Sequence, residues 1–109
     1  MLSPGHLEAR QLLLDLPTAA HADRVHDLIN LSLRYFYAGQ YDLCIKACKQ
    51  ILALDSRNPT AYNNMCSAYN EMGAWQQALS ACRQALSIDP DFELARNNLK
   101  WTQKHMDGP

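Results

Sequence analysis

Residues 59–92 read PTAYNNMCSAYNEMGAWQQALSACRQALSIDPDF, and they repeat the pattern of residues 25–58, VHDLINLSLRYFYAGQYDLCIKACKQILALDSRN. The repeat spacing is 34 residues, and identical residues that coincide at this spacing include Asn30 and Asn64, Tyr35 and Tyr69, Gly39 and Gly73, Cys48 and Cys82, Gln50 and Gln84, and Asp55 and Asp89. A fixed period of this length predicts a solenoid, in which each unit buries its apolar face against its neighbours.

Each unit divides at its glycine into two predicted helices. Apolar residues recur three and four positions apart on both sides of Gly39 and Gly73, which is the period of an amphipathic helix. Glycine suits the left-handed residue that ends a helix and starts a tight turn. Asn58 and Pro59 predict a side-chain cap and a first-turn proline, and residues 89–91 (Asp-Pro-Asp) are predicted to do the same one period later. We therefore expect two antiparallel helices per unit.

The second unit carries a spaced pattern of large, small and turn residues: Tyr62, Met65, Cys66, Tyr69, Gly73, Trp75, Ala78, Cys82, Ala85, Asp89 and Pro90. This pattern resembles the tetratricopeptide repeat. The first unit follows it except at Ser56, where proline is usual, and at the bulky Ile51. The resemblance implies an all-α helical-hairpin solenoid that binds proteins or peptides, with repeat one at 25–58 and repeat two at 59–92.

Both ends extend the array. Residues 93–105 repeat the start of the second unit and predict a capping helix, while residues 6–16 predict the helix of a partial earlier repeat. Residues 17–21 read as a break between that helix and the next. We expect residues 1–109 to be a single domain and a segment of a longer protein.

Composition argues against several classes of function. The formal net charge is −1, so no global field favours nucleic acid, and no apolar run is long enough for direct membrane insertion. There is no phosphate-binding loop, nucleophile elbow or paired-histidine motif, so we predict no enzyme activity and no cofactor. His21, Asp23, His26 and Asp27 cluster in the sequence; a solvated helix start explains them better than a metal site.

The four cysteines are Cys44, Cys48, Cys66 and Cys82, and none forms a Cys-x-x-Cys pair. All four fall at positions where packed helices need small side chains, so we expect free, buried thiols. Reduced thiols suit a reducing compartment, which favours a cytoplasmic location.

Asn30, Asn64 and Asn98 occupy the same place in three successive first helices. An amide has donors and an acceptor, so such a row can pair with the main chain of an extended peptide. The row resembles the asparagine ladder in the tetratricopeptide arm of O-linked N-acetylglucosamine transferase. The alternative is that each asparagine bonds to the neighbouring helix.

Helical spacing predicts which side chains face the concave side of the solenoid. Ten are predicted to contact a peptide: Asn30, Leu33, Phe36, Asn63, Asn64, Ser67, Asn70, Asn97, Asn98 and Trp101. Glu71, Leu94, Lys104 and His105 are expected on the same side. A carboxylate clamp of the kind found in chaperone-binding family members is disfavoured, because Ile29, Leu33, Leu94 and Asn98 stand at its positions.

Helix 25–38 is apolar nearly all round, which predicts burial on both faces. One face of this helix packs on its own repeat. The other could be covered by residues 6–16, by a second copy of the chain or by a partner peptide. We predict a non-enzymatic interaction module for a protein or peptide whose identity the sequence does not give. The alternatives are a regulatory or substrate-presenting arm of a larger enzyme, such as a glycosyltransferase, and a homo-oligomerisation module.

Overall fold

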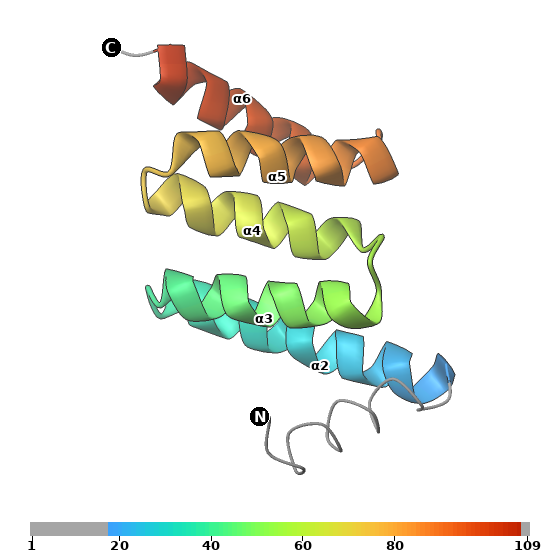
Figure 1. Ribbon diagram of the computed structural model, residues 1–109. Helices are drawn as coiled ribbons and strands as arrows, with labels where there is room; N and C mark the ends of the chain where they lie inside the picture. The colour runs from blue at the N-terminus through green and yellow to red at the C-terminus, as the bar shows by residue number, and fades with distance from the viewer. Residues whose placement is uncertain (1–17, 108–109) are drawn as a thin grey trace, which may run out of the picture.

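The computed structural model describes residues 18–107, and they form five α-helices with no strand among them (Figure 1). The helices are α2 (Thr18–Tyr37), α3 (Tyr41–Leu54), α4 (Pro59–Glu71), α5 (Trp75–Ile88) and α6 (Glu93–Asp107). Successive helices run antiparallel and stack side by side in chain order (Figure 1). The predicted all-α helical-hairpin solenoid is confirmed.

The stack of helices is curved because the first helices of successive hairpins contact one another and the second helices hardly do. Helices α2 and α3 pack as one hairpin and α4 and α5 as the next, and each hairpin contacts the helix that follows it. The first helices α2, α4 and α6 also contact one another in turn, whereas α3 and α5 make at most marginal contact. The first helices therefore line the inner, concave side.

Both hairpin turns close on a left-handed glycine. Gly39 has φ of 75° and Gly73 has φ of 72°, a region that costs other residues energy. The Gln40 N–H donates to the Tyr35 carbonyl oxygen at 2.9 Å, and the Ala74 N–H donates to that of Tyr69 at 2.9 Å. These bonds satisfy carbonyl groups left open at the helix ends, in the Schellman arrangement. The predicted turns are confirmed.

The two inter-repeat connections differ. Asn58 caps α4 as predicted, because its Oδ1 accepts from the Ala61 N–H at 2.9 Å and Pro59 fills the first turn. At α6 the predicted side-chain cap is not made. Asp89 Oδ1 instead accepts from the Asp91 N–H at 3.2 Å, which is a local turn.

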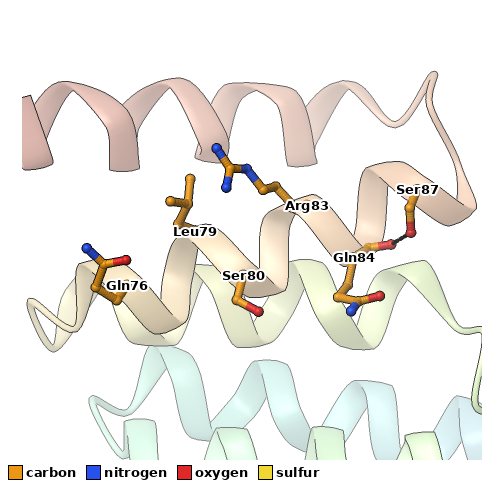
Figure 2. Close-up of a pocket in the computed structure, with 6 residues that line it drawn as sticks. All are labelled: Gln76, Leu79, Ser80, Arg83, Gln84 and Ser87. Atoms are coloured by element: carbon orange, nitrogen blue, oxygen red, sulfur yellow. Dashed lines mark hydrogen bonds between the residues drawn. The ribbon is translucent and has the colours of Figure 1, made fainter.

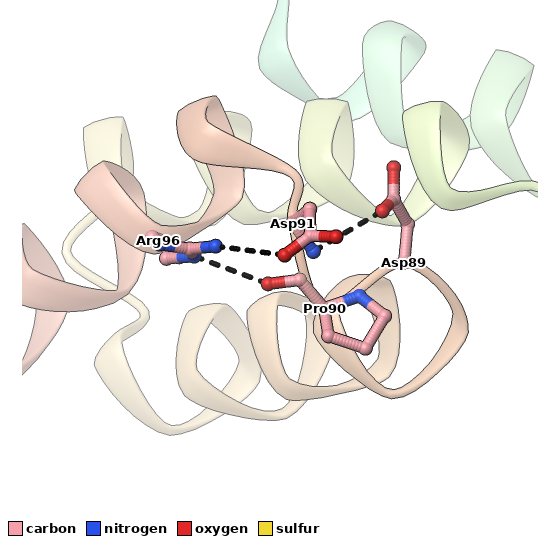
Figure 3. A network of polar contacts seen from close by, with 4 residues as sticks. All are labelled: Asp89, Pro90, Asp91 and Arg96. Atoms are coloured by element: carbon pink, nitrogen blue, oxygen red, sulfur yellow. Dashed lines mark hydrogen bonds and ion pairs between the residues drawn. The ribbon is translucent and has the colours of Figure 1, made fainter.

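Arg96 fastens this second connection to α6 (Figure 3). Its Nε donates to the Pro90 carbonyl oxygen at 3.1 Å, and its Nη2 lies 3.2 Å from Asp91 Oδ1. Both partners of the ion pair are exposed, so the pair adds little stability. The segment is held by contact with the side of the helix rather than by a cap.

The core is built mostly from small side chains. Leu28 and Ile51 are the largest fully buried residues, and the four cysteines are all completely buried. Alanines fill most of the remaining buried positions, as in Ala61, Ala68 and Ala78. Small side chains let neighbouring helices approach closely. Because each repeat has the same helix contacts, small residues recur at the same positions of the repeat.

Helix α2 differs from its prediction at its start. It begins at Thr18, so the predicted break does not extend through residues 18–21. Ala19 and Ala20 are strong helix formers, and no glycine or proline follows Pro17 there. Leu28 and Ser32 are buried while Tyr37 is 80% exposed. The predicted partial-repeat helix at 6–16 lies outside the described residues.

None of the helices between residues 18 and 107 has the length and apolar character needed to span a membrane.

Candidate functional site

Six side chains from the three inner helices line one pocket of about 210 Å³. Helix α2 contributes one of them, α4 three and α6 two: Phe36, Ser67, Asn70, Glu71, Asn98 and Trp101. All six are residues that helical spacing predicted for the concave side. The pocket therefore joins both repeats and the last helix, and no single repeat builds it alone.

The asparagine row has a structural role at two of its three positions. Asn64 is 8% exposed, and its Nδ2 donates to Ser32 Oγ at 3.1 Å. Asn98 Nδ2 donates to Asn63 Oδ1 at 2.8 Å and to Ser67 Oγ at 2.9 Å. These bonds hold each inner helix to the one before it, as the alternative interpretation of the row predicted.

Asn30 has a different environment. It is exposed, and its Nδ2 lies 3.3 Å from His26 Nε2 on the same helix. The helix that would precede α2 in register was predicted at residues 6–16, outside the described part of the chain. The three asparagines thus share a register position, but only Asn64 and Asn98 share an environment. Peptide binding by the row stays a prediction.

A second polar network fixes the floor of the pocket. The Thr102 Oγ1 lies 2.8 Å from Asn70 Oδ1 and 2.8 Å from the Asn98 carbonyl oxygen. Both are acceptors, so they share the single proton of the Thr102 hydroxyl. Asn70 Nδ2 donates to Cys66 Sγ at 3.7 Å. Thr102 is completely buried and was not predicted. Its spacing of four from Asn98 is the signal that would have placed it on the same helix face.

Trp101 is held in place by an aromatic stack. Its ring lies 4.3 Å from that of His105, which stacks at 5.0 Å on Trp75 at the start of α5. His105 Nδ1 donates to the Trp101 carbonyl oxygen at 2.9 Å. Trp101 is nevertheless 53% exposed. A large exposed ring that is already fixed loses little conformational freedom on binding.

The remaining predicted residues do not line this pocket. Leu33 is half-buried, and Asn97 is exposed on α6. Asn63 is 5% exposed, and its Oδ1 accepts the bond from Asn98. Asn30 and Asn64 also lie outside the lining.

A larger hollow of about 450 Å³ lies on α5, away from these residues. All six of its lining residues come from this one helix: Gln76, Leu79, Ser80, Arg83, Gln84 and Ser87 (Figure 2). The only bond between them is the one from Ser87 Oγ to the Gln84 carbonyl oxygen, at 2.8 Å. A surface made by one helix has no opposing wall, so it is a weaker candidate than the smaller pocket.

The cysteines correct one prediction. All four are buried, as expected, but Cys66 and Cys82 form a disulfide across the α4–α5 hairpin instead of remaining free. Their Cα atoms are 5.4 Å apart, within the range that a disulfide bridges. The sequence spacing of 16 residues could not show that these two positions face each other.

Cys44 and Cys48 are free and buried one turn apart on α3. The hydrogen bond with Cys44, together with burial, raises the pKa of the Cys48 thiol. Cys48 is therefore a protonated, unreactive core group at neutral pH. Among residues 18–107 no three His, Cys, Asp or Glu side chains gather in a way that would hold a metal ion.

Comparison with known proteins supports the repeat assignment. Residues 59–92 match the family model of the tetratricopeptide repeat. A similar solved structure is described as the second TPR of Spaghetti (RPAP3) bound to HSP90 peptide SRMEEVD, with a TM-score of 0.75. It is 19% identical, and the match covers 82% of this chain and 84% of that one. No curated protein matches the sequence.

The fold is thus a tetratricopeptide-type helical-hairpin solenoid. At 19% identity the solved structure supports the fold and no residue of the site. The resemblance to the asparagine ladder of O-linked N-acetylglucosamine transferase is not confirmed by these comparisons.

Proposed function

We propose that this chain is a non-enzymatic interaction module that holds an extended partner segment along its concave side. The observation that carries the proposal is the pocket shared by α2, α4 and α6, with Trp101 53% exposed at its edge. Exposed aromatic rings in such positions often dominate binding energy. The similar structure of the second TPR of Spaghetti, which is bound to a peptide, supports the same mode of use.

The proposed contacts divide by chemistry. Phe36, Leu33 and Trp101 supply apolar surface to the partner segment. Asn64 and Asn98 use their Nδ2 groups inside the protein, so their Oδ1 atoms are the groups offered to N–H donors of a bound main chain. Other polar contacts are proposed from the rest of the predicted set: Asn30, Asn63, Ser67, Asn70 and Asn97.

The test is a randomised library of extended peptides, screened against the 109-residue chain. Selected peptides are then measured by fluorescence polarisation with wild type and Trp101→Ala. We expect Trp101→Ala to weaken binding at least about tenfold, the scale of a central aromatic anchor.

Leu43→Ala is the control, because Leu43 is on the outer helix α3, is 39% exposed and lies outside the pocket lining. We expect its affinity to stay near wild type. Equal affinities for wild type and Trp101→Ala, or no selected peptide at all, would reject the proposal.

Two further predictions concern assembly. The first is that the chain is the arm of a larger enzyme. Sequencing the full open reading frame around residues 1–109 tests it. Self-association through residues 25–38 is tested by light scattering at two concentrations, with Tyr37→Ser as the variant because Tyr37 is 80% exposed on that helix. A monomer at both concentrations rejects self-association.

The compartment stays a prediction. The cytoplasmic proposal depended on four reduced thiols, and the Cys66–Cys82 bond removes two of them from that argument. Disulfides persist mainly in oxidising environments.

A further inference from the structure

Among residues 18–107, Glu71 is the only charged residue that lines the pocket between α2, α4 and α6. It is exposed and lies in the last turn of α4, beside Asn70. No lysine, arginine or histidine in the described part of the chain lines this pocket. A carboxylate without a basic neighbour in the pocket gives it a negative potential, which attracts a cation and repels an acidic group.

The neutral polar groups of the pocket add acceptors. Asn98 uses both Nδ2 hydrogens, toward Asn63 and Ser67, so its Oδ1 is the only group its side chain can offer a ligand. Asn70 Nδ2 is likewise turned to Cys66 Sγ. The Ser67 hydroxyl proton, the second Asn70 Nδ2 hydrogen and the Trp101 indole N–H are the neutral donors left at the site. The Glu71 carboxylate and Asn98 Oδ1 are acceptors that a ligand group rich in N–H donors can reach.

Two aromatic rings bound the same space. Phe36 comes from α2, and Trp101 comes from α6 with its ring fixed by His105. A guanidinium group stacks on aromatic faces and is attracted by the ring quadrupole, most strongly by tryptophan. The pocket has a volume of about 210 Å³. That space admits one long side chain and excludes a folded element.

We infer that this pocket binds an arginine side chain of the extended partner segment, stacked beside Trp101 and paired with Glu71. Arginine fits better than lysine because its planar, five-donor group can stack and reach several acceptors at once. This inference rests on the proposed peptide-binding function and names the chemistry that selects the peptide.

The experiment uses the 109-residue chain and peptides selected from the randomised library. Each selected peptide is resynthesised with its pocket residue as arginine, lysine, citrulline or glutamate. Citrulline keeps nearly the shape of arginine but is neutral and has a carbonyl oxygen in place of one NH2 group, so it measures the loss of the charge together with two of the five N–H donors. We expect arginine to be enriched in the selection, citrulline to bind about tenfold more weakly, and glutamate to bind more weakly still.

Glu71→Gln removes the charge and keeps the size of the side chain. We expect it to reduce the difference between arginine and citrulline peptides to the part that stacking on Trp101 supplies, and to reduce the salt dependence of binding. Asp27→Asn is the matched control: it removes one exposed charge on α2, outside the pocket lining, and should leave the discrimination intact.

The outcomes separate the two proposals. If peptides bind and Trp101→Ala weakens them, but arginine, citrulline and glutamate bind equally, the arginine pocket is wrong and the peptide-binding function stands. The same holds if Glu71→Gln leaves the arginine preference unchanged. If the library yields no peptide, both proposals fail together.

Discussion

The two full repeats have the same backbone plan but are held differently inside. Cys48 in α3 and Cys82 in α5 are equivalent positions, 34 residues apart. In repeat two, Cys82 is bonded to Cys66 of α4; in repeat one, the residue equivalent to Cys66 is Ser32 of α2. One residue type therefore decides whether a hairpin is covalently closed.

The difference matters for the candidate site. Repeat two contributes three of the six pocket residues, and its Cys66 Sγ accepts a hydrogen bond from one of them, Asn70. Repeat one contributes only Phe36. The cross-linked repeat is thus the fixed part of the pocket, and the uncrosslinked repeat supplies a single apolar wall.

Removing the cross-link should have the largest effect on stability. The bond closes a loop of 16 residues, for which the chain-entropy model gives about 3 kcal/mol. We expect dithiothreitol to lower the free energy of unfolding of the wild type by about that amount, measured by urea denaturation followed by circular dichroism.

The control is the double variant Cys66→Ala, Cys82→Ala, whose stability should not respond to the reductant. A wild type that is equally stable with and without dithiothreitol would restore the expectation of four free thiols.

Adding the missing cross-link to repeat one is the converse experiment. Ser32 and Cys48 occupy the positions that Cys66 and Cys82 occupy in repeat two, and both are completely buried. Ser32→Cys should therefore form a second disulfide, worth about 3 kcal/mol, less about 1 kcal/mol for the lost bond from Asn64 to the Ser32 hydroxyl. The expected net gain is about 2 kcal/mol in the free energy of unfolding.

Addition of Cys48→Ala to Ser32→Cys should cancel this gain, since no partner thiol remains at the facing position. A gain that survives the second substitution would show that the two hairpins do not share their internal geometry.

The hairpin turns should respond alike, since they are the most similar parts of the two repeats. Gly39→Ala and Gly73→Ala each place a Cβ on a residue with φ near +75°, which costs about 1.5 kcal/mol. The added Cβ meets nothing within 4 Å at Gly39 and only the Trp75 ring at 4.0 Å at Gly73, so strain alone sets the cost. Thermal denaturation of both variants measures it, and a clear inequality would mean that the turns are not equivalent.

The sequence predicted the helices and turns well because their signals are local and repeated. Gly39, Gly73 and Asn58 act through their own backbone and the next few residues, so their roles could be read directly. The Cys66–Cys82 bond and the Thr102 network depend on which side chains meet between helices. Periodicity assigns a helix face, but it does not give the distance between two faces.

The asparagine row shows the same limit from the functional side. The spacing gave Asn64 and Asn98 the same register position on successive inner helices, but it could not show which atoms of each amide are used there. Only the structure separates the bonded Nδ2 groups from the Oδ1 atoms that remain. That separation is why the proposed main-chain contacts are assigned to Oδ1 of Asn64 and Asn98 and not to their Nδ2 groups.

The smallest expected effect concerns the two inter-repeat connections. Asn58→Ala removes the Oδ1 that accepts from the Ala61 N–H and should cost about 1 kcal/mol, the usual cost of losing a helix cap. Phe92 occupies the equivalent position before α6, and residues 89–91 make no side-chain cap there. Asp89→Ala should therefore cost less than Asn58→Ala, because it removes only an exposed local turn bond. Urea denaturation of the two variants measures both costs, and a larger loss for Asp89→Ala would mean that the second connection is capped after all.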